Sequence, residues 1–566
     1  MYGFPLSDAV STPIEAGVTL SEAKGPKLRR PAILAAVAVA TVAAIVVLAI
    51  AWDRSVEDRL ARWATEEVAR RSGGTYRLAL GDLSLRVFSG TLAFDSAAIV
   101  TDTARNRGRA KPLPALAGRA KGCHLAGVNV LRLAFRGSLD ARELACERVA
   151  VRVALPEALK SKDSASPAAK LGRPLGLRSV RIASVALPAL TLTLVRPGRH
   201  GGTSVLLDHA RFQAKDLTFD PTAGPGEQRT PWADYARLNA TGLVVRRDTL
   251  TRIVAAGLEA SLTDSTLRLA GASYEPRIPE SEWVQRVGRR LDRVRFAVDS
   301  IHARGVAYRT YISTGDIAIR ALELDRPRLD VLTDKRMLPR PPDRKRSPQQ
   351  VAAEATSTFR LDTMLVDRGT IVYREREPKR PKPGWISFDS VRAAVLHLRL
   401  PAGRDPVRIG ARARLMNQGL LTFQVSVPLD APDFRYELSG RLGRMQAEAF
   451  NRFMSQNEKF EFDGGRVDLI TYRQSAKAGL VTTVVTPRYR DLSVERSGEA
   501  KEPLGALKRA AEELIADALV VRSHNSEAEG DDLRTVRTVH RVDPTVGWFQ
   551  VIWFGLREGL KKAIKE

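Results

Sequence analysis

The residue types that most often perform catalysis or bind metals are sparse in this chain and do not cluster. Three of its seven histidines, His124, His302 and His397, lie in stretches with the pattern of β-strands, where a surface or satisfied core position is the ordinary role. The only cysteines, Cys123 and Cys146, are too few for a zinc site of four thiolates. They either stay as two thiols or form one disulfide in an oxidising compartment. The chain is therefore expected to hold no metal and no cofactor.

Sequence motifs of the common enzyme classes are also missing. The chain contains no GxxxxGK[ST], no HExxH and no GxSxG. Its glycines fall at turns rather than in a GxGxxG that follows a strand. Acidic residues such as Glu323 and Asp325 alternate with apolar ones, which is typical of a solvated strand face. These patterns predict no catalytic residues and a protein that is not an enzyme.

The charge of the chain favours an anionic partner. Its 566 residues carry 90 Lys and Arg against 64 Asp and Glu, a formal net charge of +26. Such a balance suits nucleic acid, or the headgroups of phospholipid and lipopolysaccharide. Aromatic residues make up only 6%, so few side chains are available to stack on bases. We therefore expect a lipid surface rather than nucleic acid.

An uncharged segment, Pro31–Trp52, follows a polar leader at residues 1–30 that is predicted to be disordered. As a helix the segment would rise roughly 33 Å, and the hydrocarbon core of a bilayer is about 30 Å thick. The leader ends in a basic cluster, which by the positive-inside rule stays in the cytoplasm. We therefore predict a single-pass inner-membrane anchor with the bulk of the chain in the periplasm. The alternative is a cleaved signal peptide with small residues at Ala49 and Ala51.

Alternating apolar residues dominate the chain after the anchor. Tyr76–Val100 shows the pattern first, with one slip of phase at Gly81-Asp82 that indicates a bulge or turn. Successive side chains of a strand point to opposite faces, so the pattern predicts a hairpin with one apolar and one polar face. The residues expected on its apolar face are Leu83, Leu85, Val87, Leu92 and Phe94.

Short strands with this alternation recur along the chain, and only a few brief helices separate them. Helices are predicted at Asp53–Arg71, Pro279–Val294, Met445–Asn457 and Leu504–Val521. The resulting division is a membrane-proximal helix (53–75), an N-terminal β segment (76–335), a linker or loop (336–356), a C-terminal β segment (357–500) and a helical, amphipathic end (501–566).

So few helices cannot cover so many half-apolar strands. The apolar faces must therefore meet in sandwiches or other closed β domains, or line one long open trough. The first arrangement gives an ordinary dry core. The second exposes an apolar groove that needs a ligand with hydrocarbon chains in water. Alternation alone does not separate these two possibilities.

Several segments after residue 30 have patterns of residue type that are typical of one protein family. Gly73–Leu78 follows the short helix, and Leu83–Leu92 forms a strand pair around Ser89-Gly90. Further strand patterns occur at Phe359–Asp362 with Gly369–Tyr373, at Phe434–Met445, and at Gly464–Ile470 with Tyr489–Val494. Together with the uncharged segment before them, these patterns resemble the AsmA-like family of Gram-negative envelope proteins, in its uncharacterised-domain branch.

This resemblance implies a fold and a function. The expected fold is mainly β: an N-terminal transmembrane helix, then an elongated, curved antiparallel β-sheet groove with a few short helices. The expected function is non-enzymatic lipid transport, most simply of phospholipid, or outer-membrane assembly, possible partners being outer-membrane or envelope assembly proteins. The alternative is a periplasmic scaffold whose closed β domains bind a protein or a glycan.

The C-terminal segment Gly547–Lys565 combines aromatic, aliphatic and basic residues. Such a segment can lie in a membrane interface, because rings favour that region and basic side chains attract anionic headgroups. The alternative is a final helix that packs on its own domain. The residues predicted to contact a membrane are Trp548, Phe549, Trp553, Phe554, Lys561 and Lys562.

Overall fold

The computed structural model describes most of the chain from residue 57 onward. The described residues are 57–86, 89–110, 112–129, 132, 138–154, 179–196, 202–220, 232–337, 346–378, 380–457, 460–496, 521–526, 533–542 and 547–565. The predicted leader (1–30), the predicted membrane helix (31–52) and almost all of the predicted helix Leu504–Val521 lie outside them. Within the described part of the chain, no helix is both long enough and apolar enough to cross a membrane.

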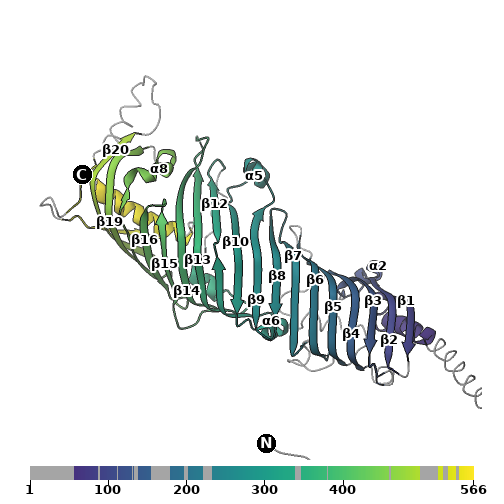
Figure 1. The fold of residues 1–566 in the computed structure, drawn as a ribbon. Helices are drawn as coiled ribbons and strands as arrows, with labels where there is room; N and C mark the ends of the chain where they lie inside the picture. Colours follow the sequence, from purple (N-terminus) through teal and green to yellow (C-terminus); the bar gives the residue numbers. More distant parts are fainter. Residues whose placement is uncertain are drawn as a thin grey trace, which may run out of the picture. The chain divides into compact units, whose positions relative to one another are not determined.

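The described strands form one curved sheet of 21 strands, in which most strands that follow each other in the chain lie side by side (Figure 1). The fold is therefore mainly β. The strands are β1 (Tyr76–Arg86), β2 (Thr91–Thr101), β3 (Ala115–Ala126), β4 (Ser138–Ala154), β5 (Ser179–Arg196), β6 (Thr203–Phe219), β7 (Tyr235–Arg246), β8 (Thr251–Ser261), β9 (Thr266–Pro276), β10 (Arg293–Arg304), β11 (Ile317–Asp325), β12 (Arg328–Asp334), β13 (Phe359–Arg376), β14 (Gly384–Leu400), β15 (Val407–Leu415), β16 (Gly419–Val427), β17 (Tyr436–Leu442), β18 (Met445–Gln446), β19 (Phe460–Lys477), β20 (Leu480–Arg496) and β21 (Val536–Arg541). The exceptions to the side-by-side order are β11 and β12, which both pair with β10 and β13, and β17 and β18, which both pair with β19.

The sheet is mixed, whereas the sequence predicts an antiparallel sheet, so that part of the prediction is corrected. β4 pairs with β5 in parallel, and β13 pairs in parallel with both β11 and β12. Parallel neighbours need a connection long enough to run back along the strand. Residues 155–178 connect β4 to β5, and residues 335–358, which include the predicted linker, connect β12 to β13. Because β11 and β12 pair with β13, the β segments on either side of this linker belong to one continuous sheet.

Many of the strands are longer than the short strands that the sequence predicts. β5, β13 and β19 contain 18 residues each. One reason is that a single residue in the left-handed conformation can shift which positions face the apolar side, while the strand itself continues. In β1 the exposed positions change from odd to even numbers at Asp82, whose φ is 26°, so the slip predicted at Gly81-Asp82 is present. Positive φ values also occur inside later strands, at His209, Asp216, Gly242, Gly271, Arg368 and Ser390.

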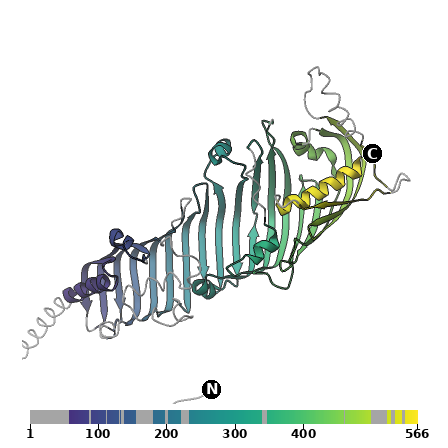
Figure 2. The ribbon, with the colours of Figure 1, turned by 180° about the vertical axis from the view of Figure 1, so that it is seen from behind.

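The described helices are short apart from one at each end of the sheet (Figure 2). The first, over residues 57–71, ends where the sequence predicts, before Gly73 and Gly74. The helix predicted at Pro279–Val294 is shorter, because Gly288 ends it in the left-handed conformation with a φ of 66°. The remaining helices are α2 (Thr103–Arg107), α5 (Glu280–Val287), α6 (Tyr308–Thr314), α7 (Pro348–Ala353), the 3₁₀ helix η3 (Ala447–Phe450), α8 (Asn451–Asn457) and α10 (Trp548–Ile564).

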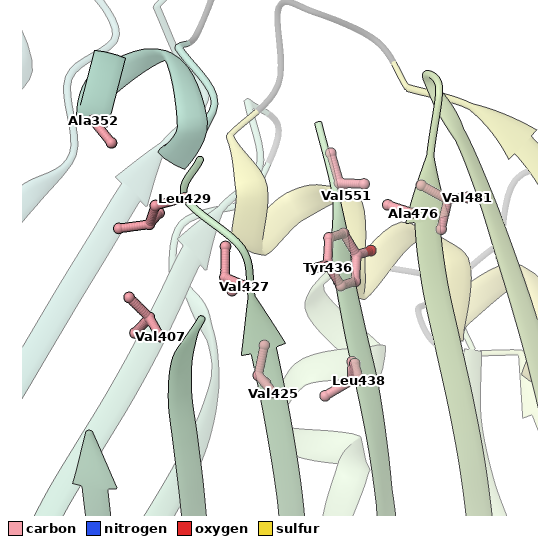
Figure 3. Close-up of a cluster of buried hydrophobic side chains, with 10 residues drawn as sticks. All are labelled: Ala352, Val407, Val425, Val427, Leu429, Tyr436, Leu438, Ala476, Val481 and Val551. Carbon is pink, nitrogen blue, oxygen red and sulfur yellow. The ribbon is translucent and has the colours of Figure 1, made fainter. Parts of the chain in front are cut away.

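The largest cluster of buried apolar side chains lies near the C-terminal end of the sheet, where α10 packs on the strands (Figure 3). Most of its members come from β15, β16, β17, β19 and β20, and α10 contributes one more. The cluster consists of Ala352, Val407, Val425, Val427, Leu429, Tyr436, Leu438, Ala476, Val481 and Val551. This end of the sheet therefore has a second layer that covers its apolar side chains.

Candidate functional site

An unbroken row of apolar residues crosses the sheet from β1 to β20. Each residue stands directly opposite the next on the neighbouring strand, so all of them share one face of the sheet. The row is Leu80, Ala97, Ala120, Val149, Leu190, Ala210, Ala240, Leu258, Leu269, Ile301, Leu324, Val366, Ala393, Ala411, Phe423, Gly440, Tyr472 and Val485. We call the face that carries this row the apolar face, and the opposite face the polar face.

Over the middle of the sheet, and among the residues that the structure describes, the apolar side chains cluster with one another. One cluster groups Leu207, Ala210 and Ala240 with half-buried leucines of β5, β7 and β8. The next cluster along the sheet groups residues of β7 to β11 around Val298. Every member of both clusters belongs to this sheet, whereas a sandwich would bring residues of a second sheet into them. Leu192 on β5 is even 36% exposed.

The hairpin residues singled out from the sequence lie at the N-terminal edge of the apolar face. Leu83 stands opposite Phe94, and Leu85 stands opposite Leu92. Leu83, Leu92 and Phe94 are half-buried, but Leu85 is only 2% exposed. The structure therefore brings these four together as predicted for one face, with Leu85 more deeply covered than the other three. The fifth residue, Val87, lies outside the described residues.

The helix over residues 57–71 is attached to this edge of the sheet. The carboxylate of Glu57 accepts a hydrogen bond of 2.6 Å from the backbone N–H of Leu85. At the other end of the helix, Val68 packs on Tyr76, whose hydroxyl donates to the carbonyl of Pro114 at 2.7 Å. Burial raises the pKa of Tyr76 to about 12. The contacts at both ends hold the helix against β1, whose neighbouring strand among the described residues is β2.

The two cysteines form a disulfide between neighbouring strands of the apolar face. Cys123 on β3 and Cys146 on β4 stand directly opposite each other, and Phe94 on β2 stands opposite Cys123. Of the two possibilities left open by the sequence, the structure contains the disulfide. It ties together β3 and β4, next to the hairpin of β1 and β2.

The C-terminal segment forms α10, which packs on the apolar face through its aromatic, aliphatic and glycine residues. Val551 is 3% exposed, and the ring of Trp548 meets that of Tyr436 edge-on, with centroids 6.1 Å apart. Gly559 lies so close to β20 that a Cβ there would come within 2.7 Å of a methyl group of Val485. The close approach is possible because glycine has no side chain. The helix therefore has the packing role that the sequence allowed as an alternative.

A buried polar chain links α10 to the strands beneath it. The hydroxyl of Tyr436 donates to Oε1 of Gln474 at 2.6 Å, and Nε2 of Gln474 donates to Oγ1 of Thr483 at 2.8 Å. The same Nε2 also donates to the carbonyl of Ile552 in α10 at 3.3 Å. Burial raises the pKa of Tyr436, so its hydroxyl stays protonated and able to donate. Each of these hydrogen-bonding side-chain atoms of Tyr436, Gln474 and Thr483 thus has a partner. The bond to Ile552 ties α10 to the strands beneath it.

The membrane-contact residues predicted on α10 do not share one environment. Trp548 is half-buried and packs against the buried cluster at this end of the sheet, and Trp553 is half-buried as well. Phe554 is 49% exposed beside His540, and Lys561 and Lys562 are exposed near the end of the helix. The side chain of Phe549 lies outside the described residues. The exposed surface of α10 therefore carries the ring of Phe554 and the side chains of Lys561 and Lys562.

The residues with catalytic potential stay apart. His124 lies 3.8 Å from Glu143, and His302 lies 3.9 Å from Glu323, each as a partly exposed cross-strand pair. In the described ranges, no group of three or more His, Cys, Asp and Glu side chains is placed to hold a metal ion.

Comparisons with known proteins do not show which family the chain belongs to. Neither the protein-family models nor the curated proteins contain a match to the chain. The resemblance to the AsmA-like family therefore stays a prediction that rests on the sequence patterns.

Proposed function

We propose that the protein handles lipid, most simply phospholipid, by holding acyl chains on the apolar face of its sheet, and that it is not an enzyme. The proposal places it in the inner membrane of a Gram-negative cell, anchored by residues 31–52, with the sheet in the periplasm. Its role there would be lipid transport or outer-membrane assembly, as the resemblance to the AsmA-like family implies.

The single observation that carries the proposal is the uninterrupted apolar row. At about 4.8 Å between strands, the row from β1 to β20 extends roughly 80 Å. A hydrocarbon core about 30 Å thick contains two layers of acyl chains, so one chain spans about 15 Å. The apolar face is therefore long enough to hold several acyl chains in succession. A face of this size exposed to water is costly, and hydrocarbon chains are the ligand that would cover it.

Other features support the proposed location. The Cys123–Cys146 disulfide is compatible with the periplasm, because disulfides persist in oxidising compartments and are rare in the cytosol. The net charge of +26 suits a protein that works beside anionic headgroups. The alternative, a scaffold of closed β domains, requires several separate β units, whereas the described strands form one sheet.

The test compares neighbouring residues on opposite faces of one strand. Leu258 on β8 belongs to the apolar row, and Glu259 beside it is exposed on the polar face. With a photo-crosslinking residue at either position, we expect lipid to be trapped at 258 and not at 259 in cells. The full-length protein purified from the same cells should carry extractable phospholipid. Equal trapping at both positions, or protein without lipid, would contradict the proposal.

A further inference from the structure

The polar face has a hollow of its own, on the side of the sheet opposite the apolar row. Its volume is about 1150 Å³, and it spans β13 to β20. Most of its lining comes from alternate residues, two per strand, as in Arg412 with Gly410 and Arg441 with Ser439. Because side chains alternate between faces, these residues point away from the apolar row, in which their neighbours Ala411 and Gly440 lie. The residues between these alternate positions, Val366, Ala393, Ala411, Phe423, Gly440 and Tyr472, also line the hollow and belong to the apolar row. The hollow therefore lies on the polar side of the strands whose other side carries this part of the row.

Arginines are the main charged groups of this hollow. Arg392, Arg412, Arg441 and Arg473 line it, and Asp367 is the only carboxylate among the lining residues. That carboxylate is already engaged, because it pairs with Arg392 at 2.9 Å and with Arg368 at 2.9 Å. The surplus positive charge of the hollow therefore comes from the other three arginines.

Those three arginines lack a partner in the part of the chain that the structure describes. The side chains of Arg412, Arg441 and Arg473 are exposed and make no ion pair or hydrogen bond with another described residue. Two neighbouring arginines do have one: Arg392 pairs with Asp367, and Arg414 donates to the carbonyl of Gln418.

The strand register places small hydroxyl residues between these arginines. Arg412 stands opposite Thr422, which stands opposite Arg441, which in turn stands opposite Thr471. With about 4.8 Å between strands, Arg412 and Arg441 are about 10 Å apart at the backbone, so both guanidinium groups can reach over Thr422. Arg473 stands opposite Ser439, two residues from Arg441 on the same face of β17. A guanidinium group offers a planar fork of donors that matches phosphate oxygens, and hydroxyls donate to the same oxygens.

We infer that this hollow binds phosphate esters, with Arg412, Arg441 and Arg473 as the binding residues. The phosphate could belong to a free sugar phosphate or to a lipid headgroup, and the chemistry of recognition is the same for both. The inference goes beyond the proposed function, because acyl chains on the apolar face are not involved in it.

The test uses the full-length protein in a non-ionic detergent, with fructose 1,6-bisphosphate as the probe in isothermal titration calorimetry. We expect saturable binding that weakens as salt is added. The double variant Arg412→Gln with Arg441→Gln should bind at least about tenfold more weakly, since a hydrogen bond to a charged group contributes about that much. Arg473→Gln provides an independent single variant. The matched control is Arg404→Gln with Arg408→Gln, which removes the same charge from residues on or beside β15 that do not line the hollow.

The outcomes separate the hollow from general electrostatics. Binding lost in the double variant and kept in the control supports the inference, whereas no binding to wild type, or an equal loss in both, overturns it. Vesicles of phosphatidylglycerol that compete with the sugar phosphate identify a lipid headgroup as the source, and vesicles that do not compete identify a free phosphate ester. Photo-trapping of acyl chains at position 258 should be the same in all variants, so a failure here leaves the proposed function standing.

Discussion

A charge placed on the apolar face, at a position where the described side chains are partly exposed, should abolish lipid binding at a small cost in stability. Leu192 on β5 is the best position, because it lies on this face opposite Leu207 and is 36% exposed. Full burial of a leucine contributes about 1.5–3 kcal/mol, so the two-thirds of Leu192 that is buried contributes about 1–2 kcal/mol. Leu192→Asp should therefore reduce the free energy of unfolding by about that amount, because the carboxylate can reach water.

The same substitution at the opposite residue should behave differently. Leu207 is only 6% exposed, so Leu207→Asp loses the full burial and leaves a carboxylate without a partner in an apolar cluster. Truncation of a buried leucine alone costs about 2–5 kcal/mol, and the unpaired charge adds to this. Thr193→Asp, which puts the same charge on the polar face beside Leu192, is the control for charge.

The assay measures two quantities on each purified full-length variant: the free energy of unfolding in urea, and the phospholipid bound per protein by mass spectrometry. We expect Leu192→Asp to lose most of its lipid with a small loss of stability, and Thr193→Asp to keep both. If Leu192→Asp keeps a full complement of lipid, the face around β5 does not hold acyl chains. If it unfolds as readily as Leu207→Asp, a second layer covers Leu192 and the reasoning from its exposure is wrong.

Three further perturbations test the ends of the sheet and its ion pairs. Gly559→Leu should lower the melting temperature in thermal unfolding, because its side chain would collide with Val485 and push α10 off β20. Reduction of the Cys123–Cys146 disulfide should cost about 3 kcal/mol in urea unfolding, the loop-closure value for a separation of 23 residues. Burial alone would raise the pKa of Asp334, but hydrogen bonds from Arg336 hold that pKa below its ordinary value. The pair therefore stabilises the fold at neutral pH, its contribution is lost as the pH falls through the lowered pKa, and Asp334→Asn should flatten the acid side of the stability profile.

The sequence predicted the apolar face well because that feature is local. Alternation in β1 and β2 depends only on consecutive residues. It correctly placed Leu83 and Phe94 on the same face of the sheet. The end of the helix at residue 71 and the slip at Asp82 are also local, since each depends on one or two glycine or turn residues.

Features that depend on pairing between distant strands were out of reach. The parallel pairing of β4 with β5 depends on how residues 155–178 return, and alternation is the same in parallel and antiparallel strands. The glycines of α10 indicate a close approach to some surface, but the partner residues Gln474, Thr483 and Val485 are more than fifty positions away. The hollow on the polar face joins residues of seven strands, so no single stretch carries its pattern. The nearest signal was Ile409–Leu415, IGARARL, in which Arg412 and Arg414 alternate with apolar residues.

The two faces of the sheet explain why so basic a chain can also carry so long an apolar surface. Alternation puts every second residue of a strand on the opposite face, so the same strand supplies Ala411 to the apolar row and Arg412 to the arginine hollow. A substitution at one position therefore changes one face and leaves the other intact.

A shift of register by one residue would instead exchange the faces and expose apolar side chains where the arginines now lie. The β14–β15 pairing, in which Ala393 faces Ala411 and Arg392 faces Arg412, keeps the faces separate at the hollow, although it sets two like charges side by side. The carboxylate of Asp367 offsets that repulsion by pairing with Arg392, and it leaves Arg412 without a partner among the described residues.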